Sequence, residues 1–257
     1  MINSIRFNTT VVIMVLVILL TGCATTSNNV QKSTSDPLES MNRAVFNFNE
    51  MVDNKVMEPV ARGYKMVMPD PLEMMIGNFF SNLNDVVVTT NAILQLNPEA
   101  ALASSTRLLI NTTFGIFGII DIASDISAVS DINISKRNED FGQTLGRYGV
   151  SSGPYIVLPF LGPSSLRDTV GIAVDSFFMD PVTQGVTGVF MNHVSYLNDV
   201  AVRMPIASTR TIHNRAQLLD AEKTLEEAAL DKYEFMRDAY LQRRTSLINN
   251  TDTKEGK

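Results

Sequence analysis

The feature that most constrains this chain is a short apolar run near its N-terminus, VVIMVLVILL, from Val11 to Leu20. One basic side chain, Arg6, precedes the run, and small residues come directly after it. This order is typical of an export signal, and the run is too short to act as a stop-transfer helix. Residues 1–22 are therefore predicted to be removed, so the fold must be built from the residues after position 22.

The single cysteine of the chain lies directly after this run, in Leu20-Thr21-Gly22-Cys23. The tetrapeptide resembles the bacterial lipobox, in which the chain is cut before the cysteine and acyl chains are attached to it. At about 0.8 kcal/mol per buried methylene, two or three acyl chains hold a protein firmly on a membrane. We predict that Cys23 is the lipidation site. The residue after the cysteine is Ala24 and not Asp. In this the chain resembles the lipoproteins that Gram-negative bacteria send to the outer membrane.

Composition excludes several functions for the rest of the chain. The 257 residues are 45% hydrophobic, which is enough for a substantial core. Lys and Arg number 21 against 27 acidic residues, and no basic block stands out, so we expect no nucleic-acid partner. His193 and His213 lie far apart with no cysteine cluster near them, so the usual zinc ligands cannot be assembled. We predict no metal site and no cofactor.

Helical spacing dominates the mature sequence. Residues 24–35 are polar and small, which predicts a flexible tether. Asp36 and Pro37 are typical of a helix start, and apolar residues then recur at helical spacing at Met41, Val45, Phe48, Val52 and Val56. Further helices are predicted over Pro71–Leu96, from Pro98 to about Asn111, as a short helix after a polar loop near Glu139, and as one long helix over Arg210–Leu247.

The helix predicted over Pro71–Leu96 leaves two alternatives open. Four asparagines argue against a bilayer-spanning helix, because each would need a hydrogen-bond partner in lipid: Asn78, Asn82, Asn84 and Asn91. The helix can pair with another helix in the core. Alternatively, it can lie in the membrane interface with Phe79 and Phe80 among the acyl chains.

A mostly apolar stretch bracketed by two Gly-Pro pairs, GPYIVLPFLGPSSLRD, runs from Gly153 to Asp168. It is too short to span a bilayer and too rich in proline for an ordinary helix or a central strand. The glycines permit sharp turns and the prolines stiffen the path, which predicts a hairpin. With helices nearly everywhere else, the predicted fold class is mainly α.

One motif invites an enzymatic interpretation. Gly149–Gly153 matches the G-x-S-x-G nucleophile elbow around Ser151, and the triad partners would come from Asp168, Asp175, His193 and His213. An elbow requires a buried strand before the serine and a helix after it, and the sequence predicts neither. A serine hydrolase is therefore not expected.

Two adjacent charged pairs have structural interpretations. Glu139-Asp140 could serve as general acid and base, but neighbouring acids in a loop usually form a solvated or helix-capping pair. Arg167-Asp168 is predicted to be an ion pair at a helix start rather than a ligand for a lipid headgroup.

Several long motifs follow the lipobox in order. They are DPLESMNRAVFNFNE (Asp36–Glu50), NFFSNL (Asn78–Leu83), LINTTFGIFGIIDIAS (Leu109–Ser124), EDFGQTLGRYGV (Glu139–Val150), GPYIVLPFLGPSSLRD (Gly153–Asp168) and RAQLLD (Arg215–Asp220). Together they resemble the MlaA family, also called VacJ. The resemblance covers roughly Asp36 to Arg244, and it departs modestly at Ser40 and Met41, where a small and an aromatic residue are frequent.

The resemblance implies a single flat, ring-like helical domain with an amphipathic central channel, over residues 36–247. The polar residues at the end of the sequence predict a disordered tail over 248–257. It implies a non-enzymatic lipoprotein on the periplasmic side of the outer membrane that removes mislocalised phospholipids from the outer leaflet. The implied partners are phospholipids, a porin trimer and a periplasmic lipid carrier of the MlaC type.

Within that picture, the apolar hairpin is hypothesised to wall the lipid channel through Tyr155, Ile156, Val157, Leu158, Phe160 and Leu161. The alternative is an internal packing loop, because apolar runs between turns are more often core than ligand contact. For the whole chain, a structural or adhesive lipoprotein is the second hypothesis, and a lipolytic enzyme the third. The identity of the phospholipids, the direction of transfer and the choice of porin stay open.

Overall fold

The computed structural model describes residues 36–130, 132–182, 200–228 and 231–249, and its fold is mainly α, as predicted. The first half consists of α2 (Glu39–Val52), the π-helical turn η1 (Asp53–Met57), α3 (Glu58–Val67), α4 (Asp70–Leu94), α5 (Pro98–Thr113) and α6 (Ile122–Val129). The second half consists of α7 (Phe141–Arg147), β1 (Tyr155–Leu158), β2 (Gly162–Ser165), α8 (Leu166–Val174), the π-helical turn η2 (Asp175–Met179), α10 (Val200–Ala228) and α11 (Lys232–Asn249).

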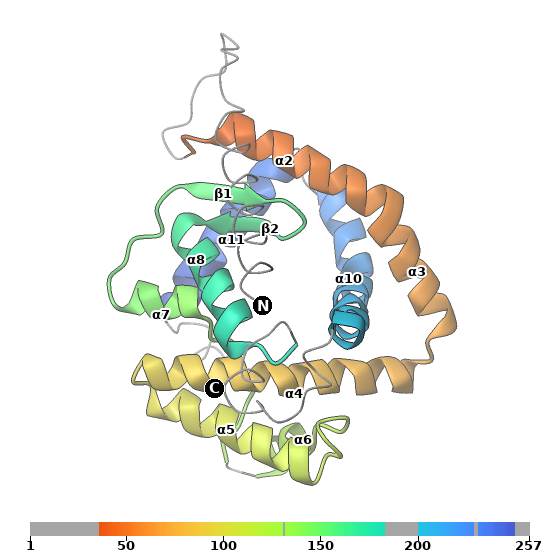
Figure 1. Ribbon diagram of the computed structural model, residues 1–257, viewed down its shortest axis with the longest axis vertical. Coiled ribbons are helices and arrows are strands. Elements are labelled where there is room, and N and C mark those ends of the chain that lie inside the picture. Colours follow the sequence, from red (N-terminus) through yellow and green to blue (C-terminus); the bar gives the residue numbers. More distant parts are fainter. Residues whose placement is uncertain (1–35, 131, 183–199, 229–230, 250–257) are drawn as a thin grey trace, which may run out of the picture.

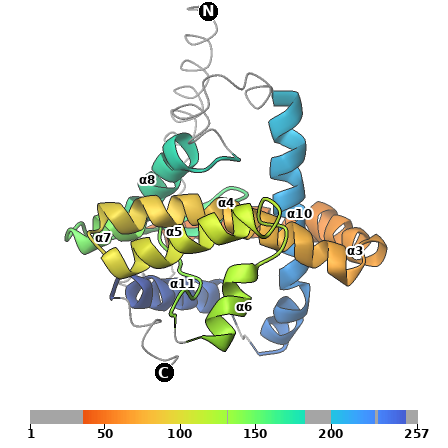
Figure 2. The ribbon, with the colours of Figure 1, turned by 90° about the horizontal axis from the view of Figure 1, so that it is seen from below.

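These elements are arranged one after another around a central space (Figure 1). The continuous helical path of α2, η1 and α3 forms one side, and the antiparallel pair α4 and α5 forms another. The hairpin, α7 and α8 lie on the remaining side, and α10 packs along α3. Figure 2, turned by a right angle, shows α8 and α11 on opposite sides of the α4–α5 pair.

Polar side chains begin several of the helices. Asn97 accepts a hydrogen bond from the backbone N–H of Ala100, 3.2 Å, at the start of α5. Asp121, Asp140 and Ser165 accept the corresponding bonds at the starts of α6, α7 and α8. Such caps satisfy N–H groups that have no partner within the helix. The predicted helix start at Pro98 and the capping role of Asp140 are confirmed.

Two predicted boundaries were wrong. Asp36 does not cap α2, which begins at Glu39. Its carboxylate instead accepts hydrogen bonds from the Asn42 side chain and the Tyr233 hydroxyl. The long helix predicted over Arg210–Leu247 is two helices, because Asp231 caps a new start. The Asp231 carboxylate accepts from the backbone N–H groups of Tyr233, 2.9 Å, and Glu234, 3.2 Å, and this local bonding competes with helix continuation.

The buried interior is unusually polar. Arg107 and Gln143 are the largest of the fully buried side chains, and Asn42, Asn91, Asp36 and Asp85 are also fully buried. Hydrogen bonds satisfy most of their polar atoms. The guanidinium of Arg107 donates to Asp121, 2.7 Å, and to the carbonyl of Ile134, 3.1 Å. Because buried polar groups must be paired, this interior specifies how the helices meet.

The apolar parts of the interior are small. The α4–α5 contact buries Val88, Ala92, Ala100 and Ala103. A second cluster joins α3 to α10 through Ala61, Ala216 and Leu219, and a third joins the hairpin to α11. Small residues let the helices approach closely, so many larger apolar side chains are left on the outside.

Candidate lipid-contact surface

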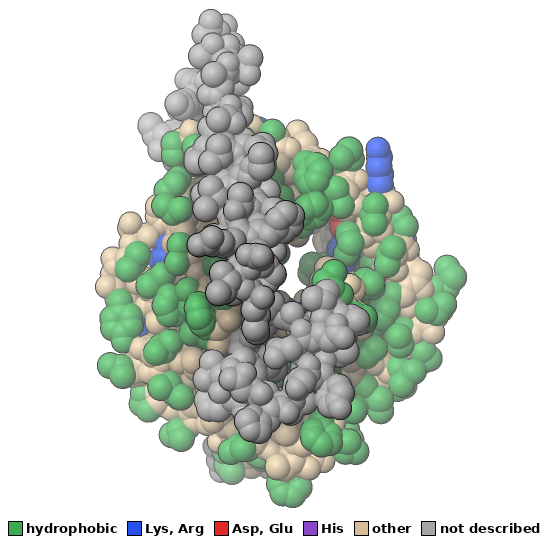
Figure 3. Space-filling model, in the orientation of Figure 1, with side chains coloured by type: hydrophobic (Ala, Val, Ile, Leu, Met, Phe, Trp, Pro, Cys, Tyr) green, Lys and Arg blue, Asp and Glu red, His purple; other side chains and the backbone are tan. Residues whose placement is uncertain are grey.

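The outer edge of the molecule carries many exposed apolar side chains, which we call the apolar rim. They come from α3, α4, the α4–α5 turn, α5, the loop after α5, the hairpin tip and η2, and six of them are Met66, Met74, Leu96, Phe117, Phe160 and Phe177. In the space-filling view they surround the outline of the body, which has an opening in its middle (Figure 3). Single exposed apolar residues are ordinary, but a surface of this extent marks contact with lipid or another protein.

None of the described helices, those of the rim included, is both long and apolar enough to span a bilayer. Each rim helix instead has one exposed apolar face and one face packed against polar or small neighbours. Helices with this division are amphipathic.

The hairpin predicted over the Gly-Pro stretch is confirmed. β1 pairs with β2 in antiparallel register, with Tyr155 opposite Ser165 and Leu158 opposite Gly162. Tyr155 and Val157 are 3% and 2% exposed and pack on Tyr233 of α11. These two side chains therefore lie in an interior cluster, whereas Ile156 and Leu158, on the opposite face of the strand, are half-buried.

The turn between the two strands is the exposed part of the hairpin. Phe160 is 73% exposed and Leu161 is 66% exposed. Phe160 has φ +64°, in the left-handed region that favours glycine, so the turn holds it in a strained conformation. Its ring meets the ring of Phe48 edge to face, with centroids 5.4 Å apart. The tip of the hairpin is thus an apolar surface attached to α2.

Two asparagines of α2, two helical turns apart, hold the free edge of β1. The Asn42 amide donates to the carbonyl of Tyr155 and accepts from the N–H of Val157, both at 2.9 Å. Asn49 makes the same pair of bonds with the carbonyl of Leu158 and the N–H of Phe160, also at 2.9 Å. We call this pair the asparagine clamp. Sequence reasoning missed it, although two asparagines in phase with an apolar stripe were a visible signal.

Phe79 and Phe80, predicted to sit at the membrane interface, are not among the exposed side chains of α4. Phe80 is 8% exposed and Phe79 is half-buried against it, with ring centroids 5.4 Å apart. The apolar side chains that α4 exposes are Leu72, Met74, Met75, Ile93 and Leu94. α4 pairs with α5, as one predicted alternative had it, and contact of either phenylalanine with lipid stays a prediction.

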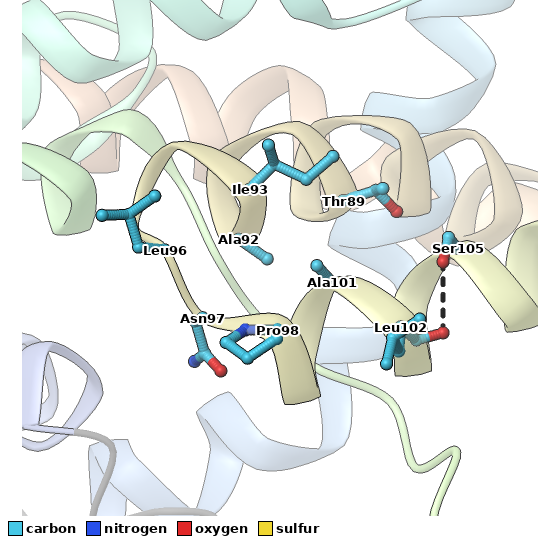
Figure 4. Close-up of a pocket in the computed structure, with 9 residues that line it drawn as sticks. All are labelled: Thr89, Ala92, Ile93, Leu96, Asn97, Pro98, Ala101, Leu102 and Ser105. Carbon is cyan, nitrogen blue, oxygen red and sulfur yellow. Dashed lines mark hydrogen bonds between the residues drawn. The ribbon is translucent and has the colours of Figure 1, made fainter.

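An apolar groove lies between α4 and α5 near their connecting turn (Figure 4). Its volume is about 570 Å³, and Ile93 of α4 and Leu102 of α5 line it, with Leu96, Asn97 and Pro98 at the turn. Leu96 has φ +54°, so the turn holds this leucine in a strained conformation with its side chain outward. The groove is continuous with the apolar rim.

Charged side chains join α7, α8 and α11 behind the hairpin. Arg167 and Asp168 form the predicted ion pair in the first turn of α8, with 2.9 Å between Nη2 and Oδ1. Arg244 of α11 binds Asp168 at 2.9 Å and also holds Asp140, and the Tyr240 hydroxyl donates to Asp168. Burial alone would raise the pKa of Asp168, but its bonds to Arg167 and Tyr240 hold that pKa below its usual value.

Glu139 and Asp140 have different surroundings although they are adjacent. Asp140 caps α7, and Arg244 outweighs the effect of burial and lowers its pKa. Glu139 is buried, and burial raises its pKa against the hydrogen bond from Gln95, 2.8 Å. The pair is therefore a cap and a buried acid rather than a solvated pair. Their bonding partners are Gln95, directly after α4, Gln143 of α7 and Arg244 of α11.

Among the described residues of the enzyme motif, no hydrogen bond joins Ser151 to Asp168, Asp175 or His213. Ser151 lies in the loop between α7 and β1, so a strand comes after it where an elbow needs a helix. His213 contacts Tyr64 across α3 and α10, with 3.2 Å between Nδ1 and the hydroxyl. Burial lowers the pKa of His213. In the described part of the chain, no group of three or more His, Cys, Asp or Glu could hold a metal ion.

Cys23 and His193 lie outside the described residues, as do the predicted tether and signal. The structure defines a helical protein with a polar interior, an apolar rim and no bilayer-spanning helix in the parts described. Comparison with known proteins places the chain in a family.

The sequence profile of the family described as MlaA lipoprotein matches residues 34–247. The chain belongs to this family. It is 35% identical over 237 residues to the "Intermembrane phospholipid transport system lipoprotein MlaA" of Escherichia coli K12, covering 92% of this chain and 87% of that protein. It is 33% identical to the protein of the same name from Haemophilus influenzae, covering 93% and 90%.

A solved structure supports the same assignment. It is described as "Structural basis for maintenance of bacterial outer membrane lipid asymmetry", and the fold matches it with a TM-score of 0.67 at 32% sequence identity. The match covers 83% of this chain and 99% of that one.

Proposed function

We propose that this protein is an outer-membrane lipoprotein that removes mislocalised phospholipids from the outer leaflet and passes them to a periplasmic carrier, which maintains lipid asymmetry. Acyl chains on Cys23 anchor it on the periplasmic side after residues 1–22 are removed, and residues 23–35 tether the helical domain of residues 36–247. The names of its relatives support this assignment. A porin trimer and a carrier of the MlaC type are the proposed partners.

The observation that carries the proposal is the apolar rim around a polar interior. Met66, Leu96 and Phe117 are exposed here, and an exposed apolar surface of the extent of the rim marks a membrane or protein contact. An apolar rim without spanning helices in the described ranges suits a body set into one leaflet. The opening seen in Figure 3 would give a phospholipid a path through such a body.

The proposal assigns the hairpin two tasks. Tyr155 and Val157 fix it in the interior, and the outward side chains, Leu158, Phe160 and Leu161, meet acyl chains beside the path. Phospholipid moves without any bond being broken, so no residue has a catalytic role. A charge on the outward side of the hairpin would obstruct acyl chains while leaving the interior cluster intact.

Leu158→Asp tests the proposal in a Gram-negative host that lacks its own copy of the protein. Leu158 is half-buried, so the variant should reach near wild-type levels in the outer membrane. Phospholipid should nevertheless accumulate in the outer leaflet, read as increased lipid A palmitoylation and sensitivity to detergent with chelator. Ser151→Ala, in an exposed loop, is the matched control and should complement fully.

A normal phenotype with Leu158→Asp would show that the hairpin does not line the lipid path. If the wild-type protein restored the detergent barrier but moved no phospholipid between membranes, the structural or adhesive hypothesis would replace transport. Loss of function with Ser151→Ala at normal protein level would revive the hydrolase hypothesis.

A further inference from the structure

A second cavity, separate from the rim, lies where α4, α7 and α11 meet. Its volume is about 340 Å³, and its lining is polar and of both charges. Glu139 and Asp140 contribute carboxylates, and Arg243 and Arg244 contribute guanidinium groups. The volume is at the lower end of the range for small-ligand sites. The role assigned to the hairpin and rim makes no use of this cavity.

Some of the side chains that line the cavity already form hydrogen bonds and ion pairs within the protein. Arg244 binds both oxygens of Asp140 and also Asp168. The Asp140 carboxylate also accepts from the backbone N–H of Gln143, 2.8 Å, and from its side-chain amide, 3.0 Å. The carboxylate of Asp140 is therefore saturated. A ligand must be recognised by the groups that remain.

Several groups remain, and three of them have no hydrogen-bond or ion-pair partner among the described residues. The side-chain oxygen of Gln143, a residue only 1% exposed, makes no hydrogen bond to any described residue. Its orientation is set, because its amide nitrogen donates to two acceptors, the Asn138 carbonyl and Asp140. Nε of Arg244 is a buried donor that likewise lacks a described partner. The guanidinium of Arg243 forms no ion pair among the described residues.

The residues that line the cavity thus carry an acceptor and donors with positive charge at the same time. Glu139, which uses one oxygen to accept from Gln95, adds a second acceptor at the cavity wall. A simple anion would satisfy the donors and leave the Gln143 oxygen unpaired. A simple cation would do the reverse. A zwitterion that carries an N–H-bearing ammonium and a phosphate satisfies both.

We propose that this cavity is a binding subsite for a phosphoethanolamine headgroup. Its phosphate binds Arg243 and Nε of Arg244, and its ammonium donates to Gln143 and Glu139. The proposal rests on the phospholipid-transfer function above and specifies its preferred substrate. A trimethylated ammonium, as in choline, has no N–H to donate and fits this subsite poorly.

The test is a calorimetric titration of the full-length, lipidated protein in detergent micelles with sn-glycero-3-phosphoethanolamine. Saturable binding is expected, and sn-glycero-3-phosphocholine and inorganic phosphate should each bind about tenfold more weakly. These two probes separate a headgroup from a free anion. Equal binding of all three would make the cavity a plain anion site and overturn the proposal, as would no saturable binding of the ethanolamine compound.

Arg243→Gln should weaken binding of the ethanolamine compound about tenfold, and Arg243→Lys should restore most of it, because the charge is kept. Arg243 is exposed and has no described ion-pair partner, so both variants should keep the wild-type unfolding midpoint. Arg62→Gln is the matched control. It removes an exposed arginine of α3, which pairs with Glu58, and should leave binding unchanged.

Transfer of phospholipid from liposomes is measured separately with the same variants. Wild-type protein that transfers lipid without binding the headgroup compound would overturn the subsite and leave the proposed function standing. Protein that transfers no lipid at all would overturn the function, whatever the calorimetry gives. If the Arg243→Gln variant bound the ethanolamine compound as well as wild type does, Arg243 would not bind the phosphate. That result would overturn the proposal of a zwitterion subsite.

Discussion

Strand β1 and the tip next to it belong to one apolar run, yet their surroundings are opposite. Tyr155 and Val157 pack against α11 in the interior, while Phe160 and Leu161 project from the surface. The asparagine clamp joins the two regions, since Asn42 binds the strand and Asn49 binds the entry to the tip. Apolar character alone therefore does not separate core from lipid contact in this protein, because the neighbours of each side chain decide it.

The largest effect is expected from Val157→Asp, which places a charge in the interior cluster. An unpaired buried carboxylate costs several kcal/mol, about 4 or more, out of a total stability of about 5 to 15. The variant should be degraded in cells and unfold at much lower urea than wild type. Phe160→Asp at the exposed tip is the matched control and should accumulate normally. Similar abundance of the two would remove the distinction between strand and tip.

A smaller loss is expected from Asn42→Ala. The change leaves the carbonyl of Tyr155 and the N–H of Val157 without partners in a buried place, at about 1 to 3 kcal/mol for each group. Asn49→Ala should cost about 1 kcal/mol, because its bonds reach the exposed tip, where water replaces them. Urea unfolding of both variants gives the comparison. Equal losses would mean that the clamp holds the tip as firmly as the strand.

Acid should weaken the side of the hairpin that faces α11. The folded pKa of Asp168 lies below its usual value of 3.8, so its ionised form is favoured by folding. Its contribution to stability is present above that usual pKa and is lost as the pH falls through the folded pKa. Tyr240→Phe removes one bond to this carboxylate and should cost about 1.5 kcal/mol at pH 7.

The difference between Tyr240→Phe and wild type should shrink below pH 4, as Asp168 becomes protonated. Thermal melts in a pH series measure it. Tyr148→Phe, which removes an exposed hydroxyl bond to the carbonyl of Leu94, is the control and should give a difference that does not depend on pH over this range. A constant difference for Tyr240→Phe as well would contradict the role of the Asp168 carboxylate.

The smallest effect on folding is expected from Phe160→Ser. The variant loses the edge-to-face contact with Phe48, which is worth about 0.5 to 1.5 kcal/mol. Its membrane affinity should fall measurably, because an exposed aromatic ring is removed from the rim. Flotation with liposomes, using protein that lacks the Cys23 anchor, reports this loss. Unchanged flotation would exclude the tip from the lipid-contact surface.

Much of the fold could be predicted from local patterns. The helix that begins at Pro98 and the hairpin between the Gly-Pro pairs depend on short-range chemistry, and both formed where expected. The break near Asp231 was missed, because helical periodicity continues through it and a single capping carboxylate is a weak signal. The sequence did not predict the exposure of Phe79 and Phe80 either, since α4 has apolar residues on both its packed and its exposed face.

By itself, the sequence determined the helical class, the hairpin, the Arg167–Asp168 pair and the family, because each depends on residues close together in the chain or on long motifs. The tertiary structure alone decided which apolar side chains are inside and which form the rim. It also joined Asn42 to β1 and Arg244 to Asp140, pairs that are more than 100 residues apart. Periodicity shows that a residue lies on an apolar face, but the partner of that face is chosen by contacts made across the whole fold.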